Sequence, residues 1–241
     1  MIGPAGIAHL LLFGILIPIS AIRAQKIIES RPLPPRRRYF VSVVVQLAVL
    51  AFISIAVAWR ELIPLFILSI PPARAIVAGC VMLVIAVSFG WTRWKKAVRE
   101  RKRVVALFMP TNASERVFWI VSAALAGFGE EVTWRGVQTA LLMRLTNNLI
   151  IAAAICVVMF SIAHAIQGWK SVGVIAVFAA AFHVLVWLAG SLYVAMAVHF
   201  IYDLIAGFAY GYLGRKLGYP IDTGFGSPDS GFVEPITTDP A

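Results

Sequence analysis

A small set of ionisable side chains sits inside stretches of the chain that are otherwise apolar. The members that could act together are Glu130, Glu131, Arg135, His164, His199 and Asp203. An ionisable group inside a membrane span costs about 2.5–3.5 kcal/mol on insertion scales, so each one needs a partner or a purpose. Carboxylates and imidazoles held together away from bulk water can activate a water molecule, either as general bases or through a divalent metal. These residue types therefore point to hydrolytic chemistry if the side chains share one inward face.

The two adjacent glutamates have different neighbours along a helix. Glu131 and Arg135 are four residues apart with the acid first, which is the order that favours an intrahelical ion pair. Glu130 lies about 100° around the helix from Glu131 and has no basic residue three or four positions away. We therefore expect Arg135 to neutralise Glu131, and a side chain from another helix to meet Glu130.

Two further segments supply the imidazoles. His199 and Asp203 are four residues apart and share a face, and His164 follows Phe160 by one helical turn. A shared inward face would unite Glu130, His164, His199 and Asp203, either around a water molecule or as ligands of a metal such as Zn²⁺. Sequence motifs of zincins, serine hydrolases and P-loop enzymes are absent. His9 and His183 match no motif, and we interpret them as packing or interfacial residues.

The elements that position these residues are predicted to be transmembrane helices. The chain has 241 residues, of which 61% are hydrophobic and 13% charged, and its mean hydropathy is +0.88. An ordinary water-soluble fold cannot bury that much apolar surface. The sequence predicts an all-α, polytopic helical membrane protein with about seven transmembrane helices of roughly 20 residues each. The expected spans are residues 2–22, 39–59, 75–91, 115–129, 149–165, 172–188 and 192–213.

Positive charge is concentrated in two loops, which indicates a membrane orientation. The net charge is +10, and most of it lies in residues 23–38 and 93–103. Loops rich in Lys and Arg stay in the cytoplasm, so we expect the N-terminus outside and the C-terminus inside. These loops lack the interleaved aromatic residues of a nucleic-acid platform, so the expected partner is the lipid bilayer and no nucleic acid. Short loops and the lack of a targeting sequence favour the cell membrane of a bacterium.

Three regions are predicted along the chain. Residues 1–113 hold the first spans and both basic loops, residues 114–213 hold the expected catalytic helical core, and residues 214–241 form a disordered tail rich in Gly, Pro and Asp. Residues 62–70 are too short to cross, and we expect them to be re-entrant or interfacial. Cys80 and Cys156 lie in apolar stretches without metal or disulfide spacing. The sequence defines neither an oligomeric state nor a substrate sequence.

Three motifs in order resemble a known family. Residues 130–135 read EEVTWR and match EExxxR, residues 160–164 read FSIAH and match FxxxH, and residues 199–203 read HFIYD and match HxxxN/D. These motifs resemble those of the CPBP intramembrane proteases, the family of the type II CAAX prenyl endopeptidases and of bacterial immunity and bacteriocin-processing proteins. The lead-in GSLYVAMAVHFIYD is also similar to that family. The resemblance covers residues 114–213.

The resemblance implies roles for individual residues. Glu130 with His164 would activate the attacking water, and His199 with Asp203 would stabilise the oxyanion. Glu131, Arg135 and Phe160 would support that site. Many members carry Asn where this chain has Asp203, and an ionised Asp repels an oxyanion, so Asp203 is protonated by burial, binds a metal or pairs with His199. The family is commonly called metalloprotease, yet a Zn²⁺ mechanism and a metal-free mechanism both stay open.

The resulting functional expectation is an intramembrane endopeptidase that cleaves a membrane-associated peptide or protein. Two alternatives use the same residues differently. Buried Asp, Glu and His side chains also form proton or ion pathways, although the chain shows no internal repeat typical of a transporter. A membrane scaffold or chaperone could also keep such a site without needing its activity.

Overall fold

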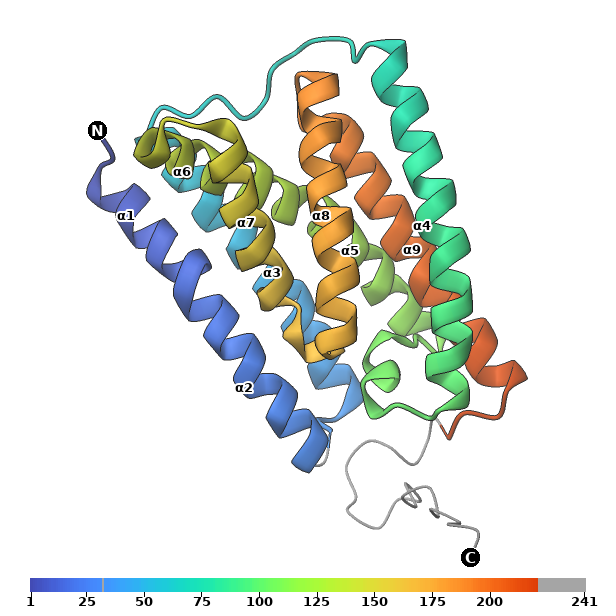
Figure 1. Cartoon of the computed structure of the whole chain (residues 1–241). Helices are drawn as coiled ribbons and strands as arrows, with labels where there is room; N and C mark the ends of the chain where they lie inside the picture. Colours follow the sequence, from blue (N-terminus) through green and yellow to red (C-terminus); the bar gives the residue numbers. More distant parts are fainter. Residues whose placement is uncertain (32, 221–241) are drawn as a thin grey trace, which may run out of the picture.

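The computed structural model describes residues 1–31 and 33–220, and these residues form a bundle of helices (Figure 1). The first helix is continuous and consists of α1 (Pro4–Leu11), η1 (Leu12–Leu16) and α2 (Ile17–Ser30). The other helices are α3 (Arg36–Arg60), α4 (Ala73–Arg99), η2 (Arg103–Phe108), α5 (Ala113–Glu130), η3 (Glu131–Gln138), α6 (Thr139–Thr146), α7 (Leu149–Ala163), η4 (Ala165–Gln167), α8 (Trp169–Ala189) and α9 (Tyr193–Lys216). The prediction of an all-helical membrane protein is confirmed.

The expected count of about seven spans is not confirmed. Within the described residues, five helices are long and apolar enough to cross a membrane, namely Pro4–Ile28, α3, α4, α8 and α9. The expected span 149–165 corresponds to α7, whose 15 residues reach only about 22 Å at 1.5 Å per residue. The expected span 115–129 lies in α5, which runs on through η3 into α6 and carries the glutamates. A helix that is short, or one that carries buried charge, falls outside the simple length and hydropathy rule.

Residues 62–70 form no helix and instead run as an extended segment across one end of the bundle (Figure 1). Leu65 is buried, and Phe66 stacks on Phe128 with ring centroids 5.9 Å apart. Pro64, with two further prolines closing the segment, disfavours helical backbone. This segment therefore lies over the end of the bundle opposite the basic loops.

Helix α5 lies at the centre of the bundle, because it packs against both α3 and α9. The approach to α9 is close: a Cβ at Gly127 would lie 2.8 Å from the backbone nitrogen of Phe200. Only glycine fits such a backbone-to-backbone contact. The contact places Glu130 and Glu131, just beyond Gly127, beside His199 on α9.

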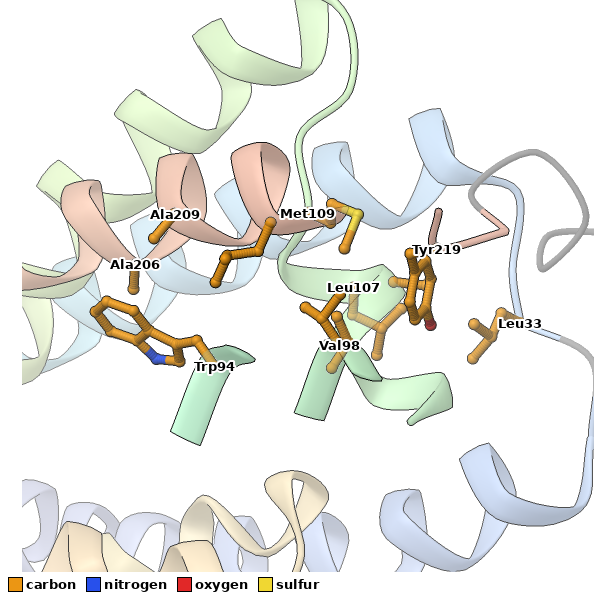
Figure 2. Close-up of a cluster of buried hydrophobic side chains, with 11 residues drawn as sticks. Leu33, Trp94, Val98, Leu107, Met109, Ala206, Ala209 and Tyr219 are labelled. Atoms are coloured by element: carbon orange, nitrogen blue, oxygen red, sulfur yellow. The ribbon is translucent and has the colours of Figure 1, made fainter. Parts of the chain in front are cut away.

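A hydrophobic cluster closes the basic end of the bundle. Figure 2 shows it between α4, η2 and α9, with Trp94, Val98, Leu107, Met109, Ala206, Ala209, Leu33 and Tyr219 labelled. The Tyr219 hydroxyl donates to the carbonyl of Lys102 at 2.9 Å, so the turn after α9 is tied to the loop after α4. Residues 221–241, most of the predicted tail, lie outside the described residues.

Candidate active site

The two glutamates lie where the central helix changes its winding. Helix α5 is α-helical to Glu130, and η3 is a π-helix from Glu131 to Gln138. π-helical segments are rare and occur frequently at functional sites. This change was not predicted, because a π-segment leaves no residue pattern that distinguishes it from an α-helix.

Glu131 is fully buried and serves two partners from one oxygen. Its Oε1 accepts hydrogen bonds from Nη1 of Arg135 at 3.0 Å and from Nδ1 of His199 at 2.8 Å. The predicted ion pair with Arg135 is therefore present. The bond from His199 was not predicted, since it depends on the packing of α9 against α5 and not on spacing within one helix.

Arg135 is held between two aromatic rings. Its guanidinium carbon lies 4.4 Å from the ring centroid of Phe160 and 5.1 Å from that of Phe182. Desolvated cation–π contacts of this kind are favourable by about 2 kcal/mol. Phe160 was predicted as a supporting residue. Phe182, which also lies 5.4 Å from the His199 ring, was missed because one Phe in an apolar helix carries no signal.

Glu130 faces the two imidazoles, as its lack of a partner on its own helix suggested. Its Oε2 lies 3.7 Å from Nε2 of His164 and 3.8 Å from Nε2 of His199. Oδ2 of Asp203 lies 3.5 Å from the same His199 nitrogen. The structure thus brings together Glu130, His164, His199 and Asp203, and these distances exceed ordinary direct hydrogen bonds.

The opposite ring nitrogen of each histidine has a fixed partner. Nδ1 of His164 lies 2.8 Å from the carbonyl oxygen of Phe160, and Nδ1 of His199 contacts Glu131. A carbonyl oxygen and a carboxylate only accept, so both Nδ1 atoms carry protons. Nε2 of each ring is the atom that faces Glu130. It is an acceptor when the ring is neutral and a donor when the ring is an imidazolium.

All four residues line one cavity of about 710 Å³ inside the bundle. The remaining walls are mainly apolar and aromatic and come from helices α2 to α5 and α7 to α9. The indole nitrogen of Trp119, on that wall, donates to the backbone carbonyl of Asp203 at 2.9 Å. The site therefore combines a small polar cluster with a large apolar space.

No metal-binding group is identified in the described part of the chain. No group of three or more His, Cys, Asp or Glu side chains there is arranged to hold a metal ion. His199 donates its Nδ1–H to Glu131, and its Nε2 lies 3.8 Å from Glu130 and 3.5 Å from Asp203. The residues predicted as possible Zn²⁺ ligands were Glu130, His164, His199 and Asp203, and that role stays a prediction.

The remaining histidines lie outside this cluster. His9 is buried, with Nδ1 2.9 Å from Oε1 of Gln138 and Nε2 3.1 Å from Oγ of Ser54. His183 lies half-buried on α8. Neither lines the cavity that contains Glu130.

The fold is that of a helical membrane bundle with acids and imidazoles on an internal cavity. Residues 112–205 match the family model described as type II CAAX prenyl endopeptidase Rce1-like. The resemblance inferred from the three motifs is thereby confirmed, and this segment is similar to a family of proteases. No curated protein and no solved structure matches the chain.

Proposed function

We propose that the protein is an intramembrane endopeptidase that hydrolyses a peptide bond of a membrane-associated substrate with a water molecule activated by Glu130 and His164. The observation that carries this proposal is the Oε2 atom of Glu130. It is buried, has no hydrogen-bond partner among the described residues, and faces both histidine Nε2 atoms. A buried unsatisfied carboxylate oxygen is costly, so its retention supports a functional use.

The spacing suits one water molecule. A hydrogen bond to water is about 2.8 Å long, and the gaps of 3.7 and 3.8 Å from Glu130 to the two Nε2 atoms are less than twice that length. Each of these pairs can therefore share a water molecule, and we propose that one water bonds to Glu130, His164 and His199. Its oxygen attacks the carbonyl carbon of the scissile bond while its proton passes to Glu130.

His199 is placed to stabilise the oxyanion that forms. It lies between the carboxyl groups of Glu131 and Asp203, at 2.8 and 3.5 Å, and this surrounding negative charge favours an imidazolium. An imidazolium Nε2–H is a charge-assisted donor to the developing oxyanion. The proton on Glu130 then moves to the leaving nitrogen as the C–N bond breaks, which returns the carboxylate.

Glu131 and Arg135 orient this donor. The ion pair holds the carboxylate that accepts from Nδ1 of His199, and the two phenylalanines hold the guanidinium. We assign Asp203 as the partner of His199. The proposed reaction uses these side chains alone.

The substrate is a membrane-associated peptide or protein, since the polar cluster opens onto an apolar cavity in a membrane bundle. The basic residues 23–38 and 93–103, which lie at the ends of α2, α3 and α4 and in the turns after α2 and α4, favour a cytoplasmic location for that end. The cell membrane of a bacterium is the proposed location. Under this orientation the N-terminus is outside.

The test compares the membrane proteomes of cells that produce the wild-type protein or Glu130→Gln. Glutamine keeps the shape of the side chain but cannot take a proton from water. We expect product termini that are present with the wild type and missing with Glu130→Gln. Val41→Ala, on the exposed face of α3, is the matched control and should leave these termini unchanged. Identical termini in wild type and Glu130→Gln would contradict the proposal.

A further inference from the structure

A chain of buried polar side chains runs from α1 to the helix that carries Glu130. Beyond the contacts of His9 with Gln138 and Ser54, Oγ of Ser54 lies 2.7 Å from Oγ1 of Thr133. Thr133 in turn donates to the carbonyl of Gly129 at 2.7 Å. The four side chains are at most 1% exposed. The chain therefore joins α1 and α3 to both ends of η3, because Thr133 is near its start and Gln138 is its last residue.

The hydrogen bonds of this chain can run in only one direction. The Gly129 carbonyl only accepts, so it uses the single hydroxyl proton of Thr133. The oxygen of Thr133 then accepts from Ser54, and the oxygen of Ser54 accepts from Nε2–H of His9. Each of these three bonds thus points toward Gly129, and Nε2–H of His9 supplies the first proton. In a neutral His9 ring Nδ1 then accepts, so the Gln138 amide must present its NH₂ group to it.

The row of hydrogen-bonded side chains ends at the transition from the α-helix α5 to the π-helix η3. Gly129 directly precedes Glu130, the last residue of α5. If that transition moved by one residue, the side chain of Glu130 would turn by up to about 100° and leave the two histidines. Helix α3 lies against the same point, since a Cβ at Gly129 would lie 3.0 Å from Cβ of Ala51. The hydroxyl of Thr133 and the close approach of α3 both act on this transition.

We propose that His9 and Ser54 are positioning residues that, through Thr133, fix the start of the π-helix and thereby hold Glu130 toward His164 and His199. The catalytic consequence rests on the proposed function, whereas the placement of Glu130 does not. His9 and Ser54 lie outside residues 112–205, so the N-terminal helices contribute to the site of the protease-like segment.

The first test observes the site without a substrate. The protein has four histidines, so ¹⁵N-histidine labelling gives a small set of ring signals. We expect Thr133→Val to move the ring signals of His164 and His199 from their wild-type positions, and Thr133→Ser to restore them. Thr146→Val is the matched control, because Thr146 also donates to the carbonyl four residues back, at 3.0 Å, but in α6. It should leave both signals in place.

Ser54→Ala removes the hydrogen bond from Ser54 to Thr133, and we expect it to move the ring signals of His164 and His199 as well. This variant tests the positioning role if Thr133→Val does not fold. Unchanged His164 and His199 signals in the folded variant overturn the positioning role, whether or not the wild type is a protease. The signals could instead move while the wild type cleaves no membrane protein. That result would support the positioning role and contradict the proposed function.

Activity gives the second readout. On a substrate identified from the proteomic comparison, Thr133→Val should lower kcat by about tenfold or more with little change in KM, because small misplacements of a reacting group slow chemistry steeply. Thr133→Ser should recover most of the rate. A loss confined to KM would contradict a role in holding Glu130.

Discussion

Two glutamates of the α5–η3 helix pair with an arginine, and the two pairs differ in how many of their polar atoms form hydrogen bonds. At the basic end, both oxygens of Glu115 bond to Arg36 at 2.7 Å, and Oε2 also accepts from the backbone and hydroxyl of Thr111 at 2.8 Å. In the site, Oε1 of Glu131 takes both bonds, and Oε2 has no partner among the described residues, like Nε of Arg135. The Glu115 pair, with both carboxylate oxygens bonded, joins two helices. The Glu131 pair leaves one carboxylate oxygen and one guanidinium nitrogen without a partner among the described residues, beside the proposed reacting groups. We infer from this difference that the Glu115 pair is structural and that the Glu131 pair serves the proposed site.

Breaking the site pair should have the largest effect on stability. Arg135→Ala strands the fully buried Glu131, a change that typically costs about 3–5 kcal/mol. We expect a lower unfolding midpoint in detergent and loss of activity together. The exposed Arg60→Ala is the control. Equal midpoints for the two variants would mean that Glu131 does not need its partner.

Breaking the structural pair should lower stability less and leave the chemistry intact. Glu115→Gln keeps an amide oxygen that can still accept hydrogen bonds but loses the carboxylate charge, so we expect a loss of about 1.5–3 kcal/mol in all, while the rate per folded molecule should stay near wild type. The contrast with Arg135→Ala is sharp, because only the site variant should lose both properties. An inactive but fully stable Glu115→Gln protein would reverse the assignment.

The Glu115 pair also predicts a pH dependence. Burial acts to raise the pKa of Glu115, but the bonds from Arg36 and Thr111 prevail and lower it to about 2 from 4.5. A lowered folded-state pKa means that the stabilisation is complete above about pH 4.5 and is lost as the pH falls toward 2. Wild type should therefore lose more stability than Glu115→Gln over this interval in detergent unfolding experiments. Parallel curves for the two proteins would contradict the pairing.

Asp203→Asn should have the smallest effect. Asparagine keeps the shape beside His199 but removes one of the two negative charges that favour the imidazolium, while Glu131 keeps the other. Activity should therefore fall only slightly and should respond little to chelators. Asp203→Ala, which removes the polar group, is the comparison. An Asp203→Asn protein that is inactive but recovers with added Zn²⁺ would instead favour a metal-binding role for this carboxylate.

Sequence reasoning predicted the helical membrane class and the ion pair of Glu131 with Arg135, because composition and spacing within one helix determine both. It also predicted that Glu130 needs partners from other helices. It could not predict the bond from His199 to Glu131, the ring of Phe182 or the chain from His9 to Thr133, which depend on how α1, α3, α8 and α9 pack. The π-helix and the number of spans were not predicted for a related reason, since local hydropathy determines neither the winding nor the length of a helix.

The most direct test of the account is the cleavage rate of purified Glu130→Gln on an identified membrane substrate, with Glu115→Gln measured beside it. General-base catalysis contributes about 10²- to 10⁴-fold. We predict a rate lower by about that factor for Glu130→Gln with an unchanged unfolding midpoint, and a near wild-type rate for Glu115→Gln with a lowered midpoint. Cleavage by Glu130→Gln at the wild-type rate would contradict the assignment of Glu130 as the residue that activates water.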